Sequence, residues 1–138
     1  DKRATGMAVK AAKARGEETT VTTVLPRLAF LCDTTTKVLD ADEATAALIA
    51  SCPVVMIECT YLGAEFEDEA RKRGHVGWCG AAGLDAYVRA GLAAGRQQTW
   101  VLIHFSLRYT DAEVAAFFAD AEACGMALVP AAPSGSKA

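Results

Sequence analysis

The chain has 138 residues, of which 52% are apolar and 22% charged, and its formal net charge is −3. This length suits a single domain with a sizeable core. No apolar run approaches the roughly 20 residues that a membrane-spanning helix needs, so we expect no membrane partner. The negative charge gives the molecule no general attraction for polyanions, so any contact with nucleic acid has to be local.

The five cysteines are odd in number, form no CxxC pair and follow no secretory apolar segment. This pattern indicates reduced thiols and an intracellular protein, with cytoplasm, nucleus and mitochondrion all open as its compartment. Cys52 and Cys124 have apolar neighbours and are expected to pack as small buried side chains. None of the cysteines is assigned a functional role.

The first elements along the chain are predicted from propensity and from breaking residues. Residues 6–15 favour a helix that Gly16 ends. Residues 19–24 are β-branched throughout and predict a strand. Pro26 interrupts this pattern, so residues 28–32 are expected to form a separate strand.

The middle of the chain continues the alternation of helix and strand. A helix is expected from Asp42 and Glu43 to Ser51, with acidic groups at its positive end. Residues 54–58 form an apolar run typical of a strand buried on both faces. Residues 64–73 predict a charged helix that ends at Gly74.

The last elements complete the pattern. A helix is expected over residues 79–94, followed by a strand over 100–104. A capping box at 110–113 begins a helix that is predicted to reach residue 123, and residues 126–129 predict the final strand. Residues 1–130 are therefore expected to form one domain, and the small, polar residues 131–138 a flexible tail.

Three groups that can bind a metal or move a proton end or follow expected strands. They are Asp33, Glu58 and His104. Alternating strands and helices predict an α/β fold with largely parallel pairing. The carboxyl ends of parallel strands share one edge, where ligands bind in such folds. We therefore expect these three side chains to lie along one edge of the sheet.

Asp33 and His104 each have a structural and a functional interpretation. His104 follows an apolar run, as does a core histidine bonded to a backbone carbonyl, yet an imidazole at a strand end beside Ser106 and Arg108 also suits a metal ligand. Asp33 precedes three threonines. It is compatible with an Asx turn and with a metal ligand oriented by those hydroxyls.

Glu58 and His75 also have a structural and a functional interpretation. Glutamate is rarely buried unless it is paired, and its partner is expected to be either a basic residue at 71–73 or a histidine that it holds in one tautomer. His75 lies between Gly74 and Gly77. A surface-loop histidine and a residue for proton transfer are both compatible with that context.

Four segments resemble, in order and spacing, the motifs of ribonuclease Z, the tRNA 3′-end endonuclease branch of the metallo-β-lactamase superfamily. The segments are residues 31–35, 57–62, 74–76 and 103–109. The similarity extends from about residue 6 to residue 129, and the His-Phe-Ser-Leu-Arg-Tyr stretch at 104–109 is its most specific part.

The resemblance implies a role for each candidate residue. Asp33 would bridge two zinc ions, and His104 would ligate one of them. Glu58 would support His75, which would protonate the leaving oxygen of a phosphodiester. Such chemistry suits a dinuclear site because paired cations activate water and neutralise phosphoryl charge.

The substrate side of the site is implied in the same way. Ser106 and Arg108 would lie near the scissile phosphate, and a tRNA precursor would be the substrate. Cys32 stands where the family has glycine, and Val76 stands where it has serine or threonine.

The His-x-His-x-Asp-His motif of the family is absent, and the chain contains only two histidines. We therefore expect the chain to be the C-terminal half of a four-layer αββα metallo-β-lactamase sandwich, with a mixed sheet flanked by helices. The missing N-terminal half of the same protein would be its partner, and a homodimer is compatible with this view. Alone, the chain should bind zinc poorly and cut nothing.

Two other functions remain open at the level of sequence. One is a catalytically inactive metallo-β-lactamase-fold half that serves as a binding or scaffold domain. The other is a small α/β domain that binds an anionic ligand at its strand ends. The second ranks last because the chain has no glycine-rich phosphate loop.

Overall fold

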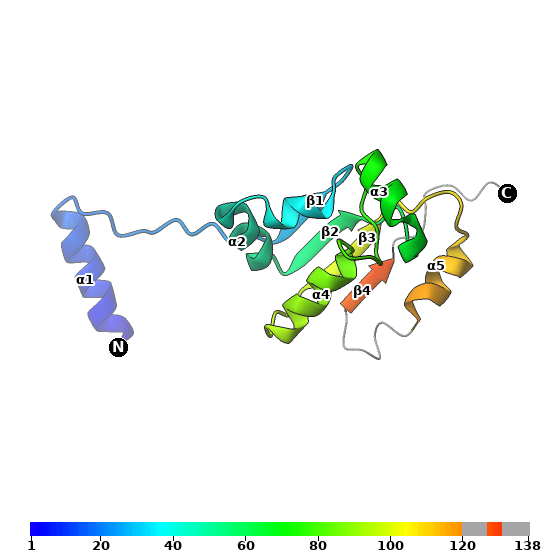
Figure 1. The fold of residues 1–138 in the computed structure, drawn as a ribbon. Coiled ribbons are helices and arrows are strands. Elements are labelled where there is room, and N and C mark those ends of the chain that lie inside the picture. Colours follow the sequence, from blue (N-terminus) through cyan, green and yellow to red (C-terminus); the bar gives the residue numbers. More distant parts are fainter. Residues whose placement is uncertain (120–126, 131–138) are drawn as a thin grey trace.

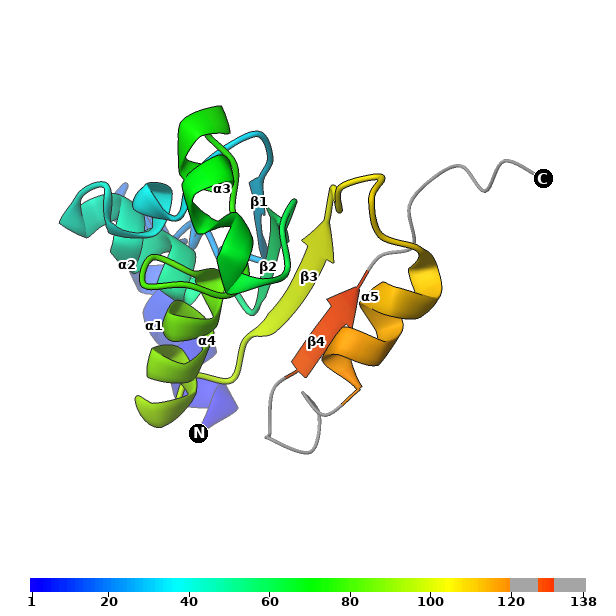
Figure 2. The same cartoon turned by 45° about the vertical axis from the view of Figure 1, so that its right-hand side comes forward.

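A computed structural model describes residues 1–119 and 127–130 of the chain. Its four strands are β1 (Leu28–Leu31), β2 (Val54–Glu58), β3 (Thr99–Ile103) and β4 (Ala127–Pro130). They form one sheet in the order β1-β2-β3-β4 (Figure 2). All three neighbouring pairs are parallel. The α/β class and the parallel pairing are confirmed, whereas the mixed sheet is not what the described strands form.

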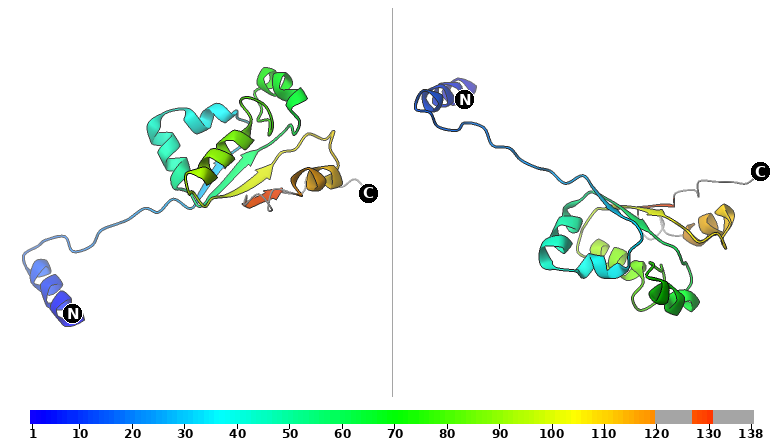
Figure 3. Two further views of the ribbon diagram at one scale, coloured as in Figure 1. Left: turned by 60° about the horizontal axis from the view of Figure 1, so that its bottom comes forward. Right: turned by 90° about the horizontal axis from the view of Figure 1, so that it is seen from above.

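The helices connect and cover these strands. The α-helices are α1 (Lys2–Ala14), α2 (Glu43–Ser51), α3 (Glu67–Arg73), α4 (Leu84–Ala93) and α5 (Asp111–Phe118), and the 3-10 helices are η1 (Thr36–Asp40) and η2 (Ala64–Phe66). Figure 3 shows α2, α3 and α4 on one face of the sheet. Within the described ranges, none of the helices is both long enough and apolar enough to cross a bilayer.

The core lies between this face of the sheet and the helices. Val55, Ile57 and Leu102 alternate with less buried neighbours on β2 and β3, and all three are fully buried. Trp78 meets Phe118 of α5 edge to face, with ring centroids 5.0 Å apart. Aromatic pairs of this kind stabilise a core beyond the area they bury, so α5 is fixed to the loop that precedes α4.

Helix α1 contributes nothing to that core. None of its residues is buried, and Figures 1 and 3 show it at the end of an extended linker, away from the sheet. The strand predicted over residues 19–24 was wrong. Val21 and Val24 are 91% and 84% exposed, because β-branched residues favour an extended backbone but make a strand only where a neighbouring strand accepts their hydrogen bonds.

The helix expected over residues 64–73 forms in two parts. It begins as the 3-10 helix η2 and continues as α3, which ends at Gly74 in the left-handed conformation with φ of 76°. Acidic residues fill the first turn of α3 and basic residues fill its last turn. Both distributions suit the helix dipole, and the predicted end at Gly74 is confirmed.

The helix expected over residues 79–94 begins five residues later than predicted. Gly80 has φ of 115°, a backbone conformation that side chains disfavour. At Gly83 an added Cβ would lie 2.3 Å from the carbonyl oxygen of Trp78. These two glycines allow a tight loop before α4, and that loop places Trp78 in the core.

The C-terminal elements agree with the sequence where they are described. The capping box is formed, because Thr110 accepts from the amide of Glu113 and the Glu113 carboxylate accepts from the amide of Thr110. Helix α5 follows, and β4 is close to the predicted strand. The expected end of the helix near residue 123 and the tail at 131–138 lie outside the described residues.

Tyr87 of α4 ties that helix to η1 by donating a hydrogen bond to Asp40. This bond, with a smaller effect of burial, raises the pKa of Tyr87 from about 10 to about 12. The folded state therefore favours the neutral phenol, and the associated stability is present below pH 10 and is lost as the pH rises towards 12.

We expect Asp40→Asn to lower the pKa of Tyr87, because the neutral amide no longer opposes the phenolate charge. An absorbance titration of the phenolate would measure the shift, with Tyr87→Phe identifying the signal. An unchanged titration in Asp40→Asn would contradict the assignment of the raised pKa to this contact.

Candidate metal centre

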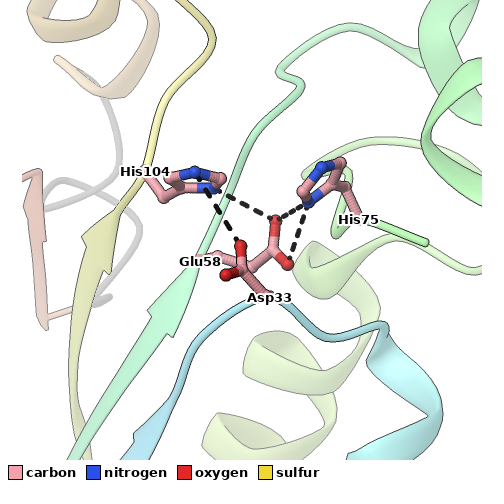
Figure 4. A group of neighbouring side chains, drawn as sticks. All are labelled: Asp33, Glu58, His75 and His104. Atoms are coloured by element: carbon pink, nitrogen blue, oxygen red, sulfur yellow. Dashed lines mark hydrogen bonds and ion pairs between the residues drawn. The ribbon is translucent and has the colours of Figure 1, made fainter. Parts of the chain in front are cut away.

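Four polar side chains meet at the carboxyl edge of the sheet. Asp33, Glu58, His75 and His104 each offer a potential ligand atom, and these atoms all lie within 4.8 Å of one another (Figure 4). Glu58 is the last residue of β2, His104 directly follows β3, and Asp33 follows β1. The predicted convergence of Asp33, Glu58 and His104 is therefore present, and His75 joins them from the loop after α3.

Asp33 and His104 are held by an uncommon backbone conformation. They are the non-glycine residues with positive φ in the described part of the chain, at 48° for Asp33 and 62° for His104. Aspartate and histidine tolerate this region better than most residues, yet each instance costs on the order of 1–3 kcal/mol. β3 ends at Ile103, one residue earlier than predicted, and Nε2 of His104 lies 3.9 Å from Oδ1 of Asp33.

Asp33 does not act as the turn former that one interpretation of the sequence offered. Among the described residues its carboxylate accepts no hydrogen bond, and it is 76% exposed, with Oδ1 3.9 Å from Nε2 of His104. The amide of Thr34 donates to Glu58 instead. Two of the threonine hydroxyls expected to orient Asp33 are used elsewhere, since Thr34 donates to the carbonyl of Thr35 and Thr36 donates to the carbonyl of Ala82. Asp33 is thus an accessible, unengaged acceptor.

Glu58 is the fully buried anchor of the group. Its carboxylate accepts from the amide of Thr34 at 2.6 Å, from the hydroxyl of Thr60 at 2.7 Å and from the amide of Val76 at 3.3 Å. Nδ1 of His75 lies 2.9 Å from Oε2. A buried carboxylate needs such donors to offset its lost hydration.

Two of the three basic residues expected as partners of Glu58 pair elsewhere. Arg71 pairs with Asp68, and Arg73 pairs with Glu69. The structure therefore realises the histidine alternative for Glu58 and not the salt-bridge alternative.

His75 is oriented by this carboxylate. Because a carboxylate only accepts hydrogen bonds, the short contact requires a proton on Nδ1 of His75. Nε2 is then the atom left for other chemistry. The ring is 25% exposed on its side chain and borders a cavity of about 160 Å³ that Lys37 and Arg71 also line. A small molecule can reach His75 from this side.

The contacts divide the four residues into two kinds. Both oxygens of Glu58 already accept hydrogen bonds, so this carboxylate orients its neighbours and is poorly placed to bind an ion. Asp33 Oδ1 and His104 Nε2 are accessible and face each other. Carboxylate oxygen and imidazole nitrogen are ordinary zinc ligands. The donor chemistry therefore fits zinc, with Asp33 and His104 as an incomplete ligand pair.

Ser106 and Arg108, predicted to bind phosphate, contact each other and the 61–69 segment. Arg108 Nε lies 3.2 Å from Ser106 Oγ. Its guanidinium lies over the ring of Phe66 at 4.4 Å and pairs with Glu69 at 3.4 Å. In this arrangement Arg108 fixes the loop after β3 against η2 and α3, and an incoming phosphate would have to compete with Glu69.

Thr60 is the residue that sequence reasoning left without a role. Its hydroxyl contacts Oε2 of Glu58 and lies 3.2 Å from Nδ1 of His104. Residues i and i+2 of an extended segment point to the same side, which places Thr60 beside Glu58. Its contact with His104, 44 residues away in sequence, depends on the tertiary fold.

The cysteines differ strongly in accessibility. Cys59 is fully buried, and burial, with a smaller effect of the Glu58 charge, raises the pKa of its thiol far above the ordinary range. Cys32 is exposed. We expect iodoacetamide at pH about 8 to modify Cys32 and to leave Cys59 intact, because the thiolate is the reactive form.

Peptide mass spectrometry of the folded chain would measure this difference, with the denatured chain as control. Equal modification of Cys32 and Cys59 in the folded chain would contradict it.

Comparison of the chain with known protein families and with curated proteins reveals no match to any family model and none to any curated protein.

Proposed function

We propose that the chain is one half of a zinc-dependent phosphodiesterase of the ribonuclease Z type that processes the 3′ ends of tRNA precursors. The observation that carries this proposal is the meeting of Asp33, Glu58, His75 and His104 within 4.8 Å at one edge of the sheet. Three of these residues come from different strand ends and the fourth from a loop. An arrangement of this kind is typical of an active site in α/β folds.

In this proposal Asp33 and His104 hold metal, and Glu58 and His75 handle a proton. Zinc, when bound, supplies an activated water and neutralises charge on the phosphate. Glu58 fixes the orientation of His75 through Nδ1. Nε2 of His75 can then take up a second proton, giving an imidazolium paired with Glu58, and pass that proton to the departing oxygen as a general acid.

The apolar face of the sheet opposite the helices supports the view that the chain is a half. Leu28 and Phe30 of β1 are 52% and 61% exposed. Met56 is the register partner of Phe30, and Val101 is the register partner of Met56, so these two residues share the face of Phe30. A second sheet from the missing N-terminal half would cover these side chains. It would also bring its loops to the Glu58 edge with the remaining metal ligands.

An assay of the complete gene product tests this function. We expect it to release the trailer from a precursor tRNA, and to hydrolyse the simple diester bis(p-nitrophenyl) phosphate, in the presence of zinc. Asp33→Ala and His75→Ala should abolish both activities, whereas the 138-residue chain alone should show neither. A complete, folded product that hydrolyses neither substrate would overturn the proposal.

Arg108 favours one alternative. Its guanidinium is engaged by Glu69 and by the ring of Phe66, which suits a fold that keeps its architecture without binding phosphate. A catalytically inactive half that serves as a binding or scaffold domain would fit this contact. In that case zinc would not bind, and replacing Asp33 would change nothing measurable.

A further inference from the structure

We infer that Thr60 is a positioning residue that fixes the tautomer of His104, so that one buried carboxylate, Glu58, orients both histidines of the site. Thr60 is 7% exposed and lies between the two groups. Its Oγ1 is 2.7 Å from Oε2 of Glu58 and 3.2 Å from Nδ1 of His104. Nδ1 of His104 is 3.8 Å from Oε2 of Glu58, too far for a direct hydrogen bond.

The direction of each hydrogen bond follows from the chemistry of the groups. A carboxylate only accepts, and a hydroxyl has a single proton to donate. Two acceptors lie within reach of this hydroxyl, Oε2 of Glu58 at 2.7 Å and the backbone carbonyl oxygen of His104 at 3.2 Å. The shorter contact, to a charged acceptor, takes the Thr60 proton. The hydroxyl can then only accept from His104, which requires the proton of the neutral imidazole to reside on Nδ1.

The position of this proton determines the state of Nε2, the other ring nitrogen of His104. With the proton on Nδ1, Nε2 of His104 presents a lone pair towards Oδ1 of Asp33, 3.9 Å away. Two acceptors then face each other with no hydrogen between them, an arrangement that a cation stabilises. His75 is held in the same tautomer by its direct contact with Glu58. Both imidazoles thus keep Nε2 free for function.

In metal sites, a residue that orients a ligating histidine has a measurable effect on metal affinity. Outer partners that fix the ring and tautomer of a ligating histidine change metal affinity by about 10–100-fold when they are replaced. The zinc part of this inference rests on the proposed function, whereas the tautomer part concerns the metal-free chain alone.

The test uses the full chain labelled with ¹⁵N-histidine, free of metal and at a pH where the rings are neutral. Long-range ¹H–¹⁵N correlation spectra identify the protonated nitrogen of each ring, and His75→Gln assigns the two signals. We expect the proton of His104 on Nδ1 in the wild type. Thr60→Val should shift the population towards protonated Nε2, and Thr60→Ser should restore it.

Thr36→Val is the matched control. Thr36 is equally buried at 7%, and its hydroxyl donates a hydrogen bond to the carbonyl of Ala82. Its replacement should leave the His104 spectrum unchanged. In a zinc titration, Thr60→Val should weaken binding by about 10–100-fold, and Thr36→Val should leave the affinity unchanged.

Two results would overturn the inference. One is a wild-type His104 protonated on Nε2, and this measurement remains decisive even if Thr60→Val does not fold. The other is a folded Thr60→Val variant with unchanged tautomer and unchanged zinc affinity. If the tautomer follows Thr60 but the complete protein cleaves no phosphodiester, the proposed function fails and the role of Thr60 stands.

Discussion

Zinc binding should depend on Asp33 and His104 and should survive the loss of His75. Asp33 and His104 offer unengaged acceptor atoms 3.9 Å apart, whereas His75 is directed towards Glu58. We expect Asp33→Asn and His104→Gln each to weaken zinc binding by more than the roughly 10–100-fold typical of a supporting residue. Zinc titration of the complete gene product in competition with a chromophoric chelator would measure the affinities of the three variants and the wild type.

His75→Gln provides the matched control, because His75 and His104 are the two histidines of the chain. Their side chains lie close together, with ring centroids 5.4 Å apart. Similar losses in both histidine variants would contradict the division into a ligand and a proton carrier. Unchanged zinc binding in Asp33→Asn and His104→Gln would remove the proposed metal site altogether.

Replacing Glu58 should cost more stability than replacing any exposed carboxylate. Glu58→Gln keeps the shape of the side chain but turns an amide group, itself a donor, towards the donors from Thr34, Thr60 and His75. Breaking such a buried arrangement leaves at least one donor unsatisfied. We expect the free energy of unfolding to fall by about 3 kcal/mol, measured by urea denaturation.

Glu65→Gln is the control for this prediction, because Glu65 is an exposed carboxylate in η2. Its replacement should change the free energy of unfolding by less than about 0.5 kcal/mol. Equal effects of the two substitutions would show that Glu58 does not anchor the fold.

The strained conformations at Asp33 and His104 concern function more than stability. Each has positive φ, and each costs on the order of 1–3 kcal/mol. Glycine would adopt the same backbone without this cost. A chain that places aspartate and histidine there accepts lower stability in return for two side chains that converge.

Most of the fold could be predicted because the signals are local. The strand over residues 54–58 was predicted at the bounds of β2, since a short apolar run after Pro53 has few other solutions. The capping box at Thr110 and the end of α3 at Gly74 depend on hydrogen bonds within one turn. The predicted strand at 19–24 failed because pairing requires a partner strand, which composition does not reveal.

The candidate site could also be predicted only in part. Chain order and strand ends were enough to place Asp33, Glu58 and His104 at one edge, because parallel strands end together. Sequence could not choose between a basic residue at 71–73 and a histidine as the partner of Glu58. Nor could it show that Arg108 faces Glu69 instead of the site.

The sequence by itself determined the order of elements, the α/β class and the residues able to do chemistry, because propensity, periodicity and capping act over a few residues. Only the tertiary structure decided that Glu58 accepts from His75, that Thr60 joins Glu58 to His104, and that Asp33 lies 3.9 Å from His104. Each of these contacts is set by the packing of distant segments, whose geometry no local pattern encodes.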